Sequence, residues 1–219
     1  MKGSAKQTSE FVERIAKMSD VTMINIEPMN YKEINDIISN INTEFICFLN
    51  HAEIELGSLS DRETFMQEKK ANVCYTNYLN ENKEKIYCND YLSDQLFSKL
   101  LVSNPFNIST MMFRHCVFDK VGLLDTTFND VFYEFILRVS KYFQFHYLDI
   151  FSITQHKIEP IKSFKDGIRL KAIEGLDKVD IYPLYSNSAD VLDNKIRQLA
   201  HQMLEQRCYQ TAIKLMERI

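Results

Sequence analysis

The residues most able to do chemistry form a short polar run, Asn50-His51-Ala52-Glu53, directly after an apolar segment. That segment, residues 45–49, is short and carries β-branched and aromatic side chains, which predicts a strand covered on both faces. In open α/β sheets, ligands bind just beyond the carboxyl ends of such strands. An amide, an imidazole and a carboxylate therefore stand where a binding site is expected.

The composition narrows the class of protein. A chain of 219 residues suits one α/β domain, or a somewhat smaller domain with an appendage. A net charge of -4 and a pI near 5.8 give no reason to propose nucleic acid or an anionic membrane as a partner. No apolar run is long enough for a membrane span, and the start, MKGSAKQTSE, lacks the apolar core of a signal peptide. These features predict a cytoplasmic protein.

Cysteine and glycine usage excludes two further kinds of site. The cysteines are scattered, odd in number and without a C-x-x-C pair: Cys47, Cys74, Cys88, Cys116 and Cys208. This pattern predicts reduced, buried thiols and argues against a structural zinc or a disulfide framework. Only five glycines occur, with no G-x-G-x-x-G or P-loop, so a glycine-rich phosphate cradle is excluded.

The elements that must position the polar run follow from periodicity. Residues 21–27 and 44–50 read as strands, and residues 30–41 between them read as a helix with Ile34 and Ile38 on its apolar face. Strand, helix and strand in this order predict a βαβ unit with a parallel strand pair and a right-handed crossover.

Further elements are expected before and after this unit. The pattern predicts a helix that begins at Thr8 or Ser9, helices over 59–70, 91–102, 116–121 and 132–142, and strands over 73–79, 108–114 and 145–151. Residues 80–89 are polar and turn-like, and Gly122 is well placed to cap the helix over 116–121. Met111, Met112 and Phe113 are expected to be core residues of a strand.

The chain changes character after Pro160. Residues 162–186 are lysine-rich and weakly periodic, whereas residues 189–206 and 209–219 have strong helical patterns that predict a helical hairpin. The hairpin resembles one tetratricopeptide-type repeat, with Ala200, Tyr209 and Ala212 at the expected small and aromatic places. A lone repeat cannot bury its own apolar face, so the hairpin must dock on the domain or on a partner.

Three segments in order resemble the family 2 glycosyltransferases, which are nucleotide-sugar-dependent enzymes on the GT-A fold. Residues 27–53 resemble the family's helix and strand that lead to its D-x-D motif. Residues 107–125, NISTMMFRHCVFDKVGLLD, resemble its acceptor-side strand, "F-R-R", short helix and "G-L-F-D". Residues 133–149 resemble its "D-Y-D-L-W-L-R" helix and "Y-x-Y-I-D" strand.

The resemblance covers roughly residues 3–160 and implies the fold class. It implies an α/β, GT-A-like domain over 1–160, with a mostly parallel sheet flanked by helices, then a connecting segment over 161–188 and a C-terminal helical hairpin over 189–219. The family's first strand has no counterpart. Lys2 stands where an aspartate would contact the base, and Tyr31 stands where the family has glycine.

The departures at the metal and base positions are the most consequential. The D-x-D motif falls on Asn50-His51-Ala52, so an amide and a methyl group replace two carboxylates and only Glu53 remains nearby. Mg²⁺ or Mn²⁺ beside a diphosphate needs anionic oxygen ligands. The catalytic base falls on Phe132, which cannot accept a proton. Asp130 and Glu134, two residues to either side, are the remaining catalytic candidates.

The resemblance also implies residues that contact the nucleotide sugar. The candidates are Asn35, Asn50, His51, Glu53 and His156, and no metal ligand set is predicted. Each has a plainer interpretation, since His51 and His156 read equally as solvated histidines and Asn35 as exposed helical polarity. Asp125 and Arg138 also match family positions. We expect Asp125 to bracket a turn and Arg138 to pair with a carboxylate inside the fold.

Three functional alternatives stay open. The first is a domain of glycosyltransferase descent that has lost metal-dependent catalysis, needs no cofactor, and acts as a binding or assembly module. The second is an active glycosyltransferase that uses Mn²⁺ or Mg²⁺ and Glu53 with Asp130 or Glu134. The third is a partial chain of such an enzyme. The implied partners are a nucleotide sugar and a protein, including a second copy bound through residues 189–219.

Overall fold

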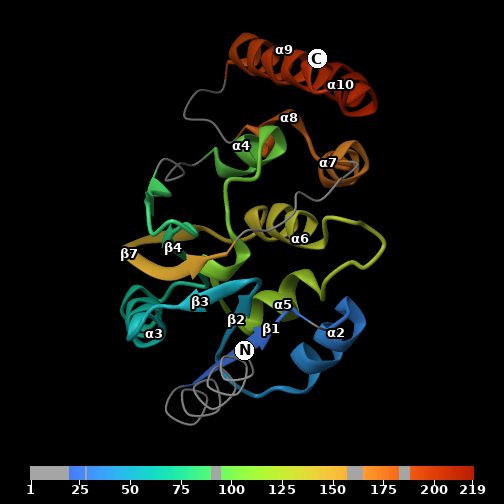
Figure 1. Cartoon of the computed structure of the whole chain (residues 1–219). Helices are drawn as coiled ribbons and strands as arrows, with labels where there is room; N and C mark the ends of the chain where they lie inside the picture. The colour runs from blue at the N-terminus through green and yellow to red at the C-terminus, as the bar shows by residue number, and fades with distance from the viewer. Residues whose placement is uncertain (1–19, 28, 90–94, 157–164, 183–187) are drawn as a thin grey trace. The chain divides into compact units, whose positions relative to one another are not determined.

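The described residues of the computed structural model, 20–27, 29–89, 95–156, 165–182 and 188–219, form two compact units (Figure 1). Unit 1 lies within residues 1–89, 106–123 and 143–159, and unit 2 lies within residues 90–105, 124–142 and 160–219. The helix expected from Thr8 or Ser9 falls outside the described residues. No helix in the described ranges is both long and apolar enough to span a membrane.

Unit 1 is built on a mixed sheet. Its strands are β1 (Val21–Asn25), β2 (Phe45–Leu49), β3 (Ala52–Ile54), β4 (Val73–Leu79), β5 (Lys85–Ile86), β6 (Met112–Arg114) and β7 (Phe145–Gln155). The strand order is β1-β2-β6-β4-β7-β3, with β5 paired to β4. Only Asn50 and His51 separate β2 from β3, yet β3 lies at the far end of this order, so the sheet curls.

The predicted βαβ unit is confirmed. β1 and β2 pair directly in parallel, with Val21 opposite Phe45 and Asn25 opposite Leu49. α2 (Tyr31–Asn40) joins them, and Asn30 and Glu33 form a reciprocal capping box at its start. Ile34 and Ile38 are buried on one face of α2. Direct β1–β2 pairing satisfies the backbone groups that an interrupted sheet would leave without partners.

The face of the sheet that packs against α3 (Ser58–Lys69) carries a sulfur-rich part of the core. Cys47, Met112 and Cys74 lie in one row across β2, β6 and β4 because Met112 is opposite both cysteines. These three side chains cluster with Leu59 and Met66 of α3. The predicted helix over 59–70 and strand over 73–79 are thereby confirmed, and burial raises the pKa of the Cys74 thiol to about 12.

Some expected elements differ in extent. The strand predicted over 108–114 begins as a 3₁₀ turn, η2 (Ile108–Thr110), because the Asn107 side chain accepts a hydrogen bond from the Ser109 N–H; only Met112–Arg114 extends as β6. Met111, Met112 and Phe113 are all buried, as predicted. β7 continues beyond the expected end at residue 151 to pair with β3. α5 (Cys116–Val121) is as predicted, with Gly122 at its C-cap.

The expectation of buried cysteines is wrong for one position. Cys47, Cys74, Cys88 and Cys208 are buried and all five cysteines are free thiols, but Cys116 is exposed. Cys116 is the first residue of α5, where its thiol lies within hydrogen-bonding distance of the Asn72 side-chain oxygen at 3.4 Å.

Unit 2 is helical. It contains α4 (Leu96–Val102), α6 (Val131–Ser140), α7 (Lys165–Ile173), α8 (Lys178–Ile181), α9 (Ala189–Glu205) and α10 (Tyr209–Met216). α4 and α6 agree with predicted helices, although residues 91–94 of the first lie outside the described residues. α7 and α8 lie in the weakly periodic segment, whose sequence did not indicate them.

The predicted C-terminal hairpin is present and docks within its own unit. α9 and α10 pack against each other, α9 also contacts α4 and α8, and α10 contacts α7 (Figure 1). Arg169 of α7 is buried at this junction, where it donates to Val102 O at 2.7 Å, to Tyr133 Oη at 3.2 Å and to Cys208 Sγ at 2.9 Å. The hairpin is therefore covered by its own chain, as the first of the two predicted docking modes requires.

Candidate functional site

The polar run Asn50–His51 lies at the carboxyl end of β2, where the sequence places the site. His51 has a φ of 46°, in the left-handed region that few residues other than glycine adopt. This conformation turns the chain from the end of β2 into β3. The Asn50 N–H donates to Ser109 Oγ at 2.9 Å, which ties the turn to η2.

One side chain that the sequence analysis missed braces this turn. Gln155 Nε2, at the end of β7, lies 3.0 Å from Asn50 O and 2.9 Å from His51 O. Its Oε1 accepts from Asn107 Nδ2 at 2.6 Å, and the His156 N–H donates to His51 O at 2.8 Å. Nothing in the local sequence marks Gln155, because its partners on the turn are about a hundred residues away along the chain.

The two histidines predicted at the site are each paired with a glutamate. His51 Nε2 lies 2.6 Å from Glu27 Oε1, and His156 Nε2 lies 3.3 Å from Glu53 Oε1. All four side chains are at least one-third exposed. The structure thus brings His51, Glu53 and His156 to the same turn as Asn50, and it places Glu27, which the sequence did not indicate as a site residue, beside His51.

These residues do not fit a divalent metal beside a diphosphate. Asn50 and Ala52, which were expected to match the D-x-D motif, present an amide and a methyl group, and the neighbouring carboxylates of Glu27 and Glu53 face imidazoles. Over the described ranges, no three histidine, cysteine, aspartate or glutamate side chains converge well enough to hold a metal ion. Hard cations require anionic oxygens that are free to coordinate them.

Asn35 lies on α2, the helix that joins β1 to β2. It is partly buried, and its backbone carbonyl accepts from Ser39 Oγ at 2.8 Å. Its expected contact with a nucleotide is not tested by these contacts and stays a prediction.

The two catalytic candidates belong to unit 2 and differ in environment. Asp130 is the N-cap of α6, where its Oδ1 accepts from the Tyr133 N–H at 3.3 Å. Burial raises the pKa of the Asp130 carboxyl, although the Tyr133 hydrogen bond and the charge of Lys165 oppose that shift. A carboxyl with a raised pKa is better suited to accept a proton near neutral pH.

Glu134 is held by cations. It is buried, with 4% of its surface exposed, and Arg138 Nε and Nη2 donate to its two oxygens at 2.9 and 2.8 Å. Lys171 Nζ lies 3.7 Å from Oε1. Both carboxylate oxygens are engaged in a bidentate ion pair, which is a structural arrangement and leaves Glu134 poorly placed to take a proton.

The expectations for Asp125 and Arg138 are confirmed. Asp125 Oδ1 accepts from the N–H and hydroxyl of Thr127, which brackets a turn, and Lys171 Nζ lies 2.5 Å from Oδ2. Hydrogen bonds from Lys171 and Thr127 hold the pKa of Asp125 well below its usual range. Arg138 pairs with Glu134 inside the fold.

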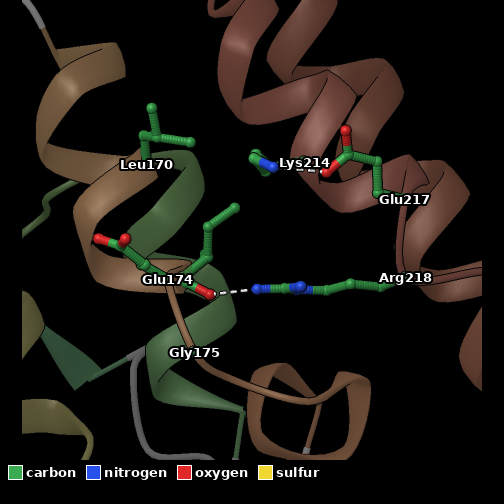
Figure 2. A pocket seen from close by; sticks show the side chains of 7 residues that line it. Leu170, Glu174, Gly175, Lys214, Glu217 and Arg218 are labelled. Carbon is green, nitrogen blue, oxygen red and sulfur yellow. Dashed lines mark hydrogen bonds and ion pairs between the residues drawn. The ribbon is translucent and has the colours of Figure 1, made fainter.

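A second feature of unit 2 is a pocket between α7 and α10. It has a volume of about 330 Å³ and is lined by Leu170, Ile173, Glu174, Gly175, Lys214, Glu217 and Arg218. Arg218 donates to the Ile173 carbonyl at 2.5 Å, and Lys214 Nζ lies 2.7 Å from Glu217 Oε2. Figure 2 shows Lys214, Glu217 and Arg218 on one side of the pocket and Leu170 and Glu174 on the other. The cations that line the pocket are thus already engaged by the fold.

Comparison with known proteins gives a fold and no family. No protein-family profile matches the chain, and no curated protein matches it. Among solved structures, S. aureus TarS 1–349 in complex with UDP-GlcNAc is similar with a TM-score of 0.58 at 13% identity, over 91% of this chain and 60% of that one. The TarS 1–349 complex with UDP gives 0.52 at 12% identity, over 96% and 76%.

The structure titled S. aureus TarS gives a TM-score of 0.58 at 14% identity, over 90% of this chain and 36% of that one. The chain spans 60% of the length of the first of these neighbours, which is less than two thirds. Identities of 12–14% show the fold alone, and that fold is GT-A-like, with a curled mixed sheet flanked by helices. The predicted α/β, GT-A-like fold class is confirmed, but the expectation of a mostly parallel sheet is wrong. Among the described strand pairs, β1–β2 and β4–β7 are parallel and the other four are antiparallel, because β3, β5 and β6 run opposite to the strands beside them.

Proposed function

We propose that this chain is a glycosyltransferase-like domain that has lost metal-dependent catalysis and acts as a binding or assembly module. The proposal rests on one observation. At the carboxyl end of β2, Asn50 and Ala52 occupy the metal-ligand positions, and the nearest carboxylates, Glu27 and Glu53, are paired with histidines. The negative charge of a diphosphate bound at this edge would therefore not be neutralised by a metal ion held on protein carboxylates.

The structural neighbours support the nucleotide-sugar part of this proposal. TarS is a family 2-type glycosyltransferase, and one of its structures contains UDP-GlcNAc. Because the fold is shared and the turn at Asn50 and His51 is polar, we propose a nucleotide sugar as a ligand of this chain as well. Any interaction of this domain with a nucleotide sugar then depends on hydrogen bonds from the turn and is weak.

Isothermal titration calorimetry tests the proposal directly. UDP and UDP-GlcNAc are titrated into the full chain with Mn²⁺, with Mg²⁺ and with EDTA. We expect weak binding whose affinity is the same in all three buffers, because no carboxylate pair is free to link the cation to the diphosphate. Tight binding that appears only with Mn²⁺ would refute the loss of metal dependence.

A protein partner is the other half of the proposal. α10 exposes Tyr209, Ile213 and Met216 at 55%, 51% and 43%, and these positions share one helical face. A second copy of the chain is the partner we propose for this face, because symmetric pairs are the commonest oligomers. Light scattering on Ile213→Asp, with Asp190→Asn as a surface control on α9, tests it: an unchanged mass refutes the dimer.

Because the hairpin packs on other helices of its own unit, deleting it cannot show whether it forms a dimer. Deleting residues 189–219 would remove Cys208 from buried Arg169 and uncover α4 and α7, so the truncated chain should aggregate whatever its oligomeric state. Point substitutions on the exposed face separate the partner from the fold.

An active glycosyltransferase is the second function, and Asp130 is the observation in its favour. Its raised pKa suits a general base, whereas Glu134 is occupied by Arg138. A coupled assay for UDP release from UDP-GlcNAc, run on the wild type and on Asp130→Asn, decides between the two functions. Turnover in the wild type that disappears in Asp130→Asn would establish catalysis; no turnover in either supports the module.

A further inference from the structure

A surface that the proposed function does not use lies where β4, β5 and β7 meet. Tyr87 directly follows β5 and is 57% exposed. Its ring meets the Phe151 ring of β7 edge to face, with centroids 5.3 Å apart, and Lys85 Nζ lies 5.2 Å from the Phe151 centroid. We call Lys85, Tyr87, Tyr147, Asp149 and Phe151 the aromatic surface.

A fully buried amide holds the parts of the aromatic surface in place. Asn77 Oδ1 accepts from the Cys88 N–H and from Tyr147 Oη, each at 2.9 Å, and Asn77 Nδ2 donates to Asp149 Oδ1 at 2.8 Å. Because Cys88 follows Tyr87, this bond fixes the backbone beside the exposed ring. The aromatic surface is therefore organised before any ligand arrives, which lowers the entropic cost of binding.

The Asp149 carboxylate lies at an irregularity in the pairing of β4 with β7. Thr76 lies opposite Leu148, but the next residue, Asn77, lies opposite Phe151, so Asp149 falls in a bulge of β7. Bulges redirect side chains and recur next to binding sites. Asp149 is exposed, and its Oδ2 makes no hydrogen bond to any residue within the described ranges, whereas its Oδ1 is engaged by Asn77 and Tyr147.

The combination of groups indicates the class of ligand. An aromatic ring that is exposed and fixed can pack against the apolar C–H face of a sugar ring. The Asp149 carboxylate, held by the same Asn77 amide as the backbone next to Tyr87, can accept from sugar hydroxyls. Burial raises the pKa of Tyr147 to about 12, so its hydroxyl keeps its single proton, which it donates to Asn77 Oδ1 or to Asp149 Oδ1, each 2.9 Å away. One strongly exposed ring is too small a surface for a stable protein interface, which needs about 800 Å² from each partner.

We propose that the aromatic surface binds a saccharide, with a pyranose ring on Tyr87 and its hydroxyls on Asp149. This site is separate in chemistry from the turn at Asn50, since it involves neither a diphosphate nor a nucleobase. It gives the domain a carbohydrate ligand whether or not a nucleotide sugar binds at the carboxyl end of β2.

Saturation-transfer NMR on the full chain tests the proposal with free saccharides: methyl glycosides of glucose, galactose and mannose, N-acetylglucosamine, cellotriose, maltotriose and chitotriose, each at millimolar concentration. We expect transfer to the ring C–H protons of at least one saccharide. That signal should disappear in Tyr87→Ala, weaken in Asp149→Asn and persist in Tyr87→Phe, which keeps the ring.

Tyr142→Ala is the matched control, because Tyr142 is exposed to the same extent at 57% but belongs to unit 2, two residues after the end of α6. Its signal should equal that of the wild type. Absence of transfer from the wild-type chain to any of the saccharides would overturn the proposal, as would an undiminished signal in Tyr87→Ala. None of the saccharides carries a nucleotide, so either result is independent of the calorimetry with UDP and UDP-GlcNAc.

Discussion

Replacing Glu134 by glutamine should destabilise the protein, and this outcome separates a structural ion pair from a catalytic base. The substitution keeps the shape of the side chain but removes its charge. Arg138 would then keep a guanidinium with two donors facing a neutral amide that has only one acceptor oxygen. Lys171, 3.7 Å from Oε1, would lose one of its two carboxylate neighbours and keep Asp125.

The size of the expected loss of stability follows from how deeply the side chains of the ion pair are buried. Breaking a fully buried ion pair by removing one partner costs about 3–5 kcal/mol. The Glu134 side chain is 5% exposed, but that of Arg138 is 21% exposed and can recover some hydration. The Lys171 side chain is 45% exposed, so its share is screened by solvent and small. We therefore expect a loss of roughly 2–3 kcal/mol, which corresponds to a fall in Tm of about 4–12 °C for a chain of this size.

Urea and thermal unfolding followed by far-UV circular dichroism measure this loss. The control is Glu205→Gln, which removes the charge from an exposed i, i+4 pair with His201 whose side chains are 67% and 74% exposed, and it should change stability by less than about 0.5 kcal/mol. If Glu134→Gln is as stable as the wild type and the wild type turns over UDP-GlcNAc while the variant does not, the structural interpretation of Glu134 is wrong and it is the base.

Three further predictions concern the site and the ion pairs. Restoring carboxylates with Asn50→Asp and Ala52→Asp should create Mn²⁺-dependent UDP binding that calorimetry detects, without UDP release from UDP-GlcNAc; unchanged calorimetry would contradict the assignment of these positions. Gln155→Ala should lower stability to urea by about 0.5–1.5 kcal/mol, because the backbone carbonyls of the turn lose a partly buried donor. Asp125 has a lowered pKa in the fold, so its contribution is complete above its unfolded pKa of about 3.9 and is lost as pH falls below it. The Tm of Asp125→Asn should therefore depend less on pH than that of the wild type between about pH 5 and pH 2, and parallel profiles would refute this.

The proposed sites lie on different parts of unit 1. The backbone of the turn at Asn50 is hydrogen-bonded to side chains of η2 and β7, whereas the aromatic surface is held by the buried Asn77 amide on β4. Each can be altered by substitution without touching the other, since Tyr87 and Asn50 share no hydrogen-bond partner among the contacts described. The two binding proposals therefore stand or fall separately.

The sequence by itself determined the elements whose causes are local. Asn30 and Glu33 sit at the spacing of a capping box, and Ile34 and Ile38 repeat at helical spacing, so α2 and the parallel strands around it were predictable. The same holds for α5, because Gly122 adopts a φ of 84° at its end. Asn50 and Ala52 in place of two carboxylates were likewise evident from residue types alone.

Only the tertiary structure decided what those residues contact. Gln155 braces Asn50 because β7 runs past its predicted end and meets β3, and no local pattern encodes a pairing between strands about a hundred residues apart. α7 was missed because its weak periodicity gives no local signal, although Arg169 on it is fixed by Tyr133 and Cys208. Local periodicity reports which face of an element is apolar, whereas hydrogen bonds between distant side chains depend on how the elements pack, and the contacts that define both sites are of the second kind.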